Sequence, residues 1–282
     1  MSYREILVHL DAEPASAGGN RRQQYAISLA AAFKAHLTGL VFDLEPVVPW
    51  VGLGSLPADF LESLRQETTE AAQLAAGAFS SAARAEAIEH EPRIVHARLG
   101  AAPDHLASQA RVSDLVVLGQ RTLERTLEFQ DELIKAALFE SGRPVLIVPY
   151  TGYDSFKFER IIVAWDGGRE AARAAHDALP ILTRTRSVEV LVIGDRSIAS
   201  RSENPGADLA LHLARHGVNA TAKRVSAADI DIGNAVLSHA ADYGADLLVM
   251  GGFARPRLRQ LILGGMTRSI LDSMTLPVVM SH

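Results

Sequence analysis

The feature that most constrains the fold of this chain is a pattern of apolar runs that occurs twice. Each copy opens with a run that ends in Asp, continues to a run that ends in Gly, and closes on a run led by Pro. The first copy comprises EILVHLD (5–11), SDLVVLG (113–119) and PVLIV (144–148), and the second RIIVAWD (160–166), ADLLVMG (245–251) and PVVM (277–280). Such a repeat predicts two folding units of one architecture.

Between these runs, apolar residues recur at helical spacing. The predicted helices span 21–35, 60–87, 104–111, 131–139, 170–182, 207–216, 232–243 and 267–274. Strands that alternate with such helices indicate βαβ units, and continuously apolar strands are typical of parallel sheets covered on both faces. We therefore predict an α/β fold of two tandem doubly wound domains, residues 1–150 and 155–282, joined by the linker YTGYDS (150–155).

Composition narrows the class of protein. The chain has 282 residues and no cysteine, which excludes disulfides and thiolate metal sites. We find no apolar run of the roughly 18 residues that a membrane span needs, and the charged N-terminus does not fit a signal peptide. A net charge of −5 argues against general nucleic-acid binding. We expect a cytoplasmic protein without a nucleic-acid or membrane partner.

The repeat also indicates where a ligand would bind. In an open parallel sheet, ligands bind at the carboxyl ends of the strands, where the strand order reverses. Asp11 and Asp166 end the first strand of each unit, and Gly119 and Gly251 end the fourth. For Asp166, two interpretations stay open: its carboxylate accepts hydrogen bonds from a ligand, or it caps the next helix.

The segment GGFARPRLRQLILGGMT (251–267) carries three arginines and two glycine pairs, and it leads into a predicted helix. A glycine-rich turn that feeds a helix N-terminus is a potential anion site. Gly264 and Gly265 would let the backbone approach a phosphate, and Thr267 could donate its hydroxyl. The alternative is an ordinary loop that caps a helix. Neither GxxxxGK[ST] nor GxGxxG after a strand occurs in the chain.

The order strand–Asp, strand–Gly, G-x2-G-x9-G-[ST] and Pro-Val-Val resembles the universal stress protein family, in its tandem form, over nearly the whole chain. The resemblance implies five-stranded parallel sheets of the adenine nucleotide alpha hydrolase-like kind, with ATP or AMP bound in some members. It assigns Asp166 to adenine or ribose and Ile193 to adenine. It places Met250 and Gly251 beside the ribose, and Gly264, Gly265, Met266 and Thr267 at the phosphates. It also implies antiparallel pairing of the edge runs 145–148 and 278–280.

The chain departs from the family motif in both units. In the second, Ala254 replaces a glycine and Gly265 stands where a hydroxyl residue is usual, although Thr267 offers a hydroxyl nearby. In the first, glycine is absent between Gly119 and Gly142. Carboxylates that would repel phosphate stand there instead, namely Glu124, Glu128, Asp131 and Glu132. We predict that the first domain does not bind a nucleotide.

We expect a stress-response module that binds ATP or AMP, with Mg²⁺ as an accompanying ion, mainly in the C-terminal domain. The alternative is an interaction scaffold without nucleotide, acting on an unidentified protein partner through surfaces such as the loop at 46–57. A third hypothesis, an enzyme such as a slow ATPase, ranks last, because Asp166 is the one obvious acid near the predicted pocket. The sequence does not decide whether the chain forms a homodimer.

Other candidate residues carry weaker signals. His212 and His216 have the i,i+4 spacing of zinc ligands on a predicted helix, but no third ligand accompanies them. His9 lies two residues before Asp11, and a hydrogen-bonded core position is its simplest interpretation. Trp165 could line an adenine pocket or lie in the core.

Overall fold

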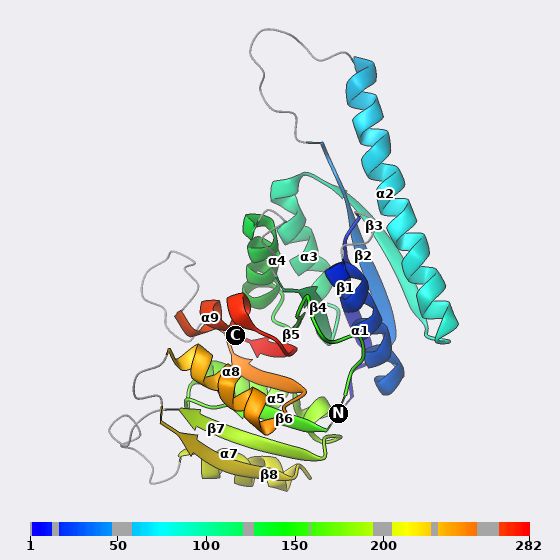
Figure 1. Ribbon diagram of the computed structural model, residues 1–282. Helices are drawn as coiled ribbons and strands as arrows, with labels where there is room; N and C mark the ends of the chain where they lie inside the picture. The colour runs from blue at the N-terminus through cyan, green and yellow to red at the C-terminus, as the bar shows by residue number, and fades with distance from the viewer. Residues whose placement is uncertain are drawn as a thin grey trace.

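The computed structural model of the chain describes residues 2–12, 17–46, 58–120, 127–157, 159–193, 205–226, 231–252 and 265–282. The strands are β1 (Glu5–Leu10), β2 (His36–Leu44), β3 (His90–Ala97), β4 (Leu115–Gly119), β5 (Val145–Val148), β6 (Arg160–Ala164), β7 (Ser187–Ile193), β8 (Ala220–Val225), β9 (Leu247–Gly251) and β10 (Val278–Ser281). They form a ten-stranded sheet in the order β3-β2-β1-β4-β5-β10-β9-β6-β7-β8 (Figure 1). We refer to β1–β5 and their helices as the N-terminal unit, and to β6–β10 and theirs as the C-terminal unit.

The helices connect the parallel strands. They are α1 (Ala17–Phe33), α2 (Ala58–Ala85), the short 3-10 helix η1 (Leu99–Ala101), α3 (Ala102–Ala110), α4 (Leu127–Glu140), α5 (Arg169–Asp177), α6 (Leu179–Leu182), α7 (Pro205–Arg215), α8 (Ile232–Tyr243) and α9 (Gly265–Ser273). One prediction was wrong: the helix expected over 170–182 is two helices, α5 and α6. The break follows from Pro180, which has no N–H to continue the helical hydrogen bonds.

The two units meet edge to edge. Strands β5 and β10 pair antiparallel, with Leu146 opposite Val279, while the other strand pairs of the sheet are parallel. This confirms the expected fold class and the expected pairing of 145–148 with 278–280. Neither unit leaves this edge exposed, because each covers the other's. The domain boundaries themselves stay a prediction.

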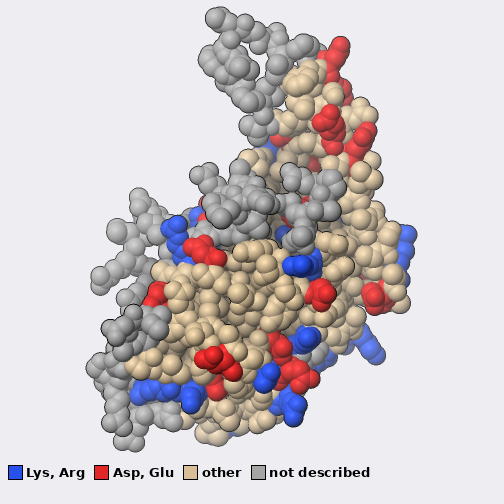
Figure 2. All heavy atoms as spheres, in the orientation of Figure 1, with Lys and Arg blue, Asp and Glu red and all other residues tan. Residues whose placement is uncertain are grey.

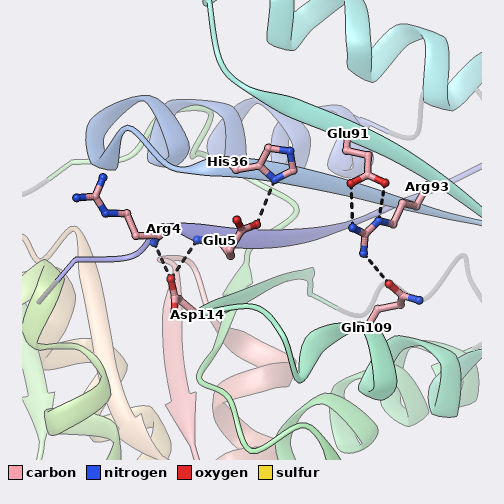
Figure 3. Close-up of polar contacts among 7 residues, drawn as sticks. All are labelled: Arg4, Glu5, His36, Glu91, Arg93, Gln109 and Asp114. Carbon is pink, nitrogen blue, oxygen red and sulfur yellow. Dashed lines mark hydrogen bonds and ion pairs between the residues drawn. The ribbon is translucent and has the colours of Figure 1, made fainter.

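The repeat extends to individual hydrogen bonds at the amino ends of the strands. In the N-terminal unit, Asp114 Oδ2 accepts from Glu5 N at 3.0 Å, and Asp114 N donates to Glu5 O at 2.8 Å (Figure 3). In the C-terminal unit, Asp246 Oδ2 accepts from Arg160 N at 3.0 Å, and Asp246 N donates to Arg160 O at 2.8 Å. The Asp that precedes the fourth strand of each unit therefore ties that strand to the first.

Helices cover both faces of the sheet, and each face has a core that spans both units. Helices α1, α2, α5, α6 and α7 pack on one face, where they form the first core. Helices α3, α4, α8 and α9 pack on the other face, where they form the second core. The segment between the units joins the first core: Phe156 N donates to Ser28 Oγ at 2.7 Å, and its ring meets Tyr25 edge-on at 5.7 Å. The units are thus continuous through backbone pairing and through side-chain packing.

Helix α2 extends beyond the sheet (Figure 1). Its buried residues begin at Ala72, and none of the side chains described over 59–71 is buried. The exposed carboxylates of this end gather along the helix in Figure 2, and they are Asp59, Glu62, Glu67 and Glu70. Among the helices described, none is long and apolar enough to cross a membrane.

Candidate functional site

The predicted site of the C-terminal unit lies at the carboxyl ends of three adjacent strands. Strand β6 lies between β9 and β7, so the strand order reverses here. Val163 is opposite Val249, and Ala164 is opposite Leu191. This register places Asp166, Ile193 and Gly251 together at one edge, as the sequence predicted. Met250 also reaches this edge, but its side chain is buried in the core and offers only backbone to a ligand.

Asp166 is exposed and shapes the turn that leads into α5. Its Oδ1 accepts from Gly168 N at 2.8 Å, and Gly167 has a φ of 77°, a conformation that glycine adopts without strain. This bond closes the turn before α5 and is not a helix cap, because Gly168 is itself the N-cap residue and has no side chain to cap α5. The ligand interpretation remains compatible with it, because the carboxylate is held at the surface of the sheet edge.

Gly251 lies against the start of α5. A Cβ at this position would be 2.6 Å from Ala171 N and 2.7 Å from the carbonyl carbon of Glu170. Burial would raise the pKa of the Glu170 carboxyl, but the hydrogen bond from Arg169, at 2.5 Å, and the charge of His282 help to bring it below its usual value. Glycine thus lets β9 and α5 approach closely, with a buried carboxylate beside them.

Helix α9 begins at the same edge of the sheet. Strand β9 ends there, and β10, which runs parallel to β9, starts at the opposite edge, so α9 leads the chain back. Gly265 is exposed, Met266 is half-buried and Thr267 is buried. Gly264, Ala254 and the arginines 255, 257 and 259 lie outside the described residues. The structure therefore brings the start of α9 to the edge but does not test the rest of the predicted phosphate loop.

Asp231 fixes α9 against α8. Its Oδ2 accepts from Ser269 Oγ at 2.7 Å and from Asn234 N at 3.3 Å, so one carboxylate caps α8 and holds α9. The hydrogen bond from Ser269 is the main reason that the pKa of Asp231 lies below its usual value. The middle of α9 is thereby attached to the start of α8.

The corresponding edge of the N-terminal unit is filled by its own side chains. Arg22 of α1 pairs with Asp11 at 2.9 Å; Arg22 is buried and Asp11 is half-buried. A Cβ on Gly119 would be 2.7 Å from Arg22 Nη1, so the guanidinium lies directly on the end of β4. Gln130 Nε2 donates to Gly119 O at 2.7 Å from the side of α4. No ligand can approach Gly119 here without displacing Arg22.

Sequence reasoning missed Arg22, Gln130 and the neighbouring Gln120. The available signal was the repeat itself, because Gln120 follows Gly119 where Gly252 follows Gly251. Of the carboxylates expected to repel phosphate, Glu124 lies outside the described residues, as does the side chain of Glu128. Glu132 is exposed and pairs with Lys135 at 2.8 Å.

The other candidates do not form a site. The His212 and His216 rings are 4.7 Å apart on α7, and within the described ranges no three His, Asp or Glu side chains are grouped to hold a metal ion. His9 packs against Phe42 at 5.5 Å, and Trp165 packs against the first core. A cavity of about 420 Å³ lies between α3 and α4, and another of about 490 Å³ lies at the amino ends of β6 and β7. Neither contains a predicted site residue.

Comparisons with known proteins agree with this architecture. Residues 157–282 match the model of the universal stress protein family. A universal stress protein from Archaeoglobus fulgidus is 15% identical, with a TM-score of 0.72 over 98% of this chain and 97% of that chain. A candidate universal stress protein from Pseudomonas aeruginosa is 17% identical. Its TM-score is 0.56 over 99% of this chain and 93% of that chain.

A similar fold also occurs in a domain of a transport protein. The cytoplasmic domain of a prokaryotic cation chloride cotransporter is 13% identical, with a TM-score of 0.50 over 99% of this chain and 95% of that chain. No curated protein sequence matches this chain. At these identities the structural likeness establishes the fold alone, and the family rests on the match of residues 157–282. The C-terminal unit of this chain belongs to the universal stress protein family, and the whole chain has the fold of a two-unit universal stress protein.

Proposed function

We propose that this protein is a stress-response module that binds one adenine nucleotide, ATP or AMP, in its C-terminal unit. The observation that carries the proposal is the difference between the two matching edges of the sheet. At one edge Asp166 is exposed beside Gly251, and at the other Asp11 is half-buried and paired with Arg22. The exposed carboxylate at the first edge can contact a ligand, whereas the carboxylate at the second edge is paired with Arg22.

The elements around Asp166 suit the parts of a nucleotide. The exposed carboxylate can accept hydrogen bonds from ribose hydroxyls or the adenine amino group. Ile193, at the end of β7, offers backbone groups and a half-buried apolar side chain to the base. The start of α9 provides backbone N–H groups and the positive end of the helix dipole to the phosphates. Mg²⁺ would arrive bound to the triphosphate.

A pair of glycine substitutions tests the phosphate position. An added Cβ on Gly265 meets no atom within 4 Å, and the same holds for Gly77 in α2. Gly265→Asp therefore adds a carboxylate at a helix N-terminus, where it does not disturb the fold. It should repel phosphate, and we expect ATP to bind at least tenfold more weakly by calorimetry. Gly77→Asp is the control, with unchanged affinity.

Gly264→Asp, at the neighbouring position, should abolish binding. Equal affinity in wild type, Gly265→Asp and Gly264→Asp would overturn the placement of the phosphates. Release of co-purified ligand by denaturation, followed by mass spectrometry, identifies the nucleotide independently of titration.

The alternative function is a scaffold that binds a protein partner without nucleotide. Ala254 and Gly265 favour it, since both depart from the binding motif of the family. An absence of co-purified nucleotide, together with no heat on titration with millimolar ATP, ADP or AMP, would select the scaffold.

A further inference from the structure

The side chain of Gln120 connects the filled edge of the N-terminal unit to α9 of the C-terminal unit. Gln120 directly follows β4 and is buried. Its Nε2 donates to Leu271 O at 3.0 Å, and its Oε1 accepts from Tyr150 N at 3.3 Å. Its backbone N–H donates to Val148 O at 2.8 Å. One residue thus joins β4, the segment after β5 and α9.

The bond to Leu271 caps the C-terminal end of α9. The last carbonyl groups of a helix lack partners within the helix, and a buried one needs a donor from elsewhere. Ile270 O accepts from Met274 N at 2.7 Å, and Leu271 O accepts from Gln120. An amide N–H₂ is also a favourable group at the negative end of the helix dipole.

The contact has no equivalent on the other side of the pseudo-symmetric junction. Gly252 occupies the position of Gln120, and its N–H donates to Ser281 O at 2.9 Å as that of Gln120 does to Val148 O. Gly252 has no side chain to reach α4, and a Cβ there would lie 3.8 Å from Leu138. The side-chain bond therefore runs from the N-terminal unit to α9 and not the reverse.

We propose that Gln120 is a positioning residue for the ligand site of the C-terminal unit. It holds α9 from its C-terminal end while Ser269 holds it through Asp231, so the first turn of α9 is presented to ligand in a fixed place. The N-terminal unit, with its own edge filled by Arg22, would then set the affinity of the other unit. This consequence for affinity rests on the proposed nucleotide binding, whereas the effect on α9 does not.

Two substitutions separate the bonds of Gln120. Gln120→Leu removes both side-chain bonds at similar volume. Gln120→Glu keeps an acceptor for Tyr150 N but loses the donor to Leu271 O. The matched control is Gln109→Leu, since Gln109 is a partly buried glutamine of α3 that accepts from Arg93 Nη1 at 2.7 Å, apart from α9 (Figure 3).

The methionine methyl groups provide the readout, because the chain has only five methionines. Met266 lies in the first turn of α9, and Met274 directly follows its last residue. In NMR spectra of full-length protein labelled at the methionine methyls, we expect both Gln120 variants to shift or broaden Met266 as well as Met274. Gln109→Leu should leave both signals in place. A change confined to Met274 means a local structural role, and it overturns the proposal.

Titration with AMP and ATP then separates this proposal from the proposed function. If wild type binds, the Gln120 variants should bind about three- to tenfold more weakly, the effect of losing one buried hydrogen bond. Unchanged affinity in both variants overturns the positioning role. If wild type binds neither nucleotide, the proposed function fails, and the response of Met266 to the Gln120 variants still decides whether Gln120 positions α9.

Discussion

At the scale of single residues, the ion pair between Arg22 and Asp11 distinguishes the two units. The side chains are only 4% and 9% exposed, so each charge depends on the other for compensation. The pair lies where the matching edge of the C-terminal unit leaves Asp166 exposed. This ion pair is the structural basis for our proposal that the N-terminal unit binds no nucleotide.

Removal of Arg22 should therefore destabilise the protein without restoring a site. We expect Arg22→Leu to lower the free energy of unfolding by about 3 kcal/mol, because Asp11 keeps a buried charge without its cation. Urea denaturation measures this change. Arg22→Leu with Asp11→Asn should recover part of the loss. A cost of the double variant equal to the sum of the costs of Arg22→Leu and Asp11→Asn would mean that the two residues do not interact.

The hydrogen bond from Ser269 to Asp231 predicts a pH dependence. Because the pKa of folded Asp231 lies below its unfolded value, its contribution to stability is present above the unfolded pKa and is lost as the pH falls through the folded pKa. Ser269→Ala removes the largest cause of this shift, so NMR titration should find the pKa of Asp231 raised toward its usual value. The same pKa in both proteins would contradict the contact between α9 and α8.

At the scale of elements, Gly251 and Gly77 predict opposite effects of one substitution. Gly251→Ala places a Cβ 2.6 Å from backbone of α5, so β9 and α5 must separate. We expect a loss of about 1–3 kcal/mol in urea denaturation. Gly77→Ala meets no neighbour on α2 and should stabilise by about 0.5–1 kcal/mol, since alanine favours helix. A stable Gly251→Ala protein would argue against this packing.

Elements with a strong periodic signal could be predicted from the sequence, and their contacts could not. The apolar runs placed the ends of β4 and β9 correctly at Gly119 and Gly251. Helix ends were predicted less accurately. Helix α1 begins at Ala17 rather than at 21, because its first turn contains glycines, which are poor helix formers and gave no helical signal. The Gln120–Leu271 bond joins residues 151 positions apart, which no local pattern reveals.

At the scale of the whole molecule, the shared sheet and cores predict that both units unfold together. Phe156, in the segment between the two units, contacts Tyr25 and Phe33 of α1, with ring centroids 5.7 Å and 6.3 Å apart. Phe156→Ala should lower the free energy of unfolding by about 2 kcal/mol. The urea midpoints of both units should therefore fall by a similar amount. Hydrogen exchange measures the unfolding of each unit separately, with β1 peptides for the N-terminal unit and β6 peptides for the C-terminal unit. Two well-separated midpoints in wild type would contradict a continuous molecule.

The central claim is that, of the two units that share one fold, the C-terminal unit alone binds a nucleotide. Its most direct test is the number of adenine nucleotides bound per chain, measured by calorimetry with ATP and AMP on full-length protein. We expect one nucleotide per chain in wild type and at least tenfold weaker binding in Gly265→Asp. Two nucleotides per chain would mean that Arg22 does not close the N-terminal edge. None in wild type would mean that neither edge is a nucleotide site.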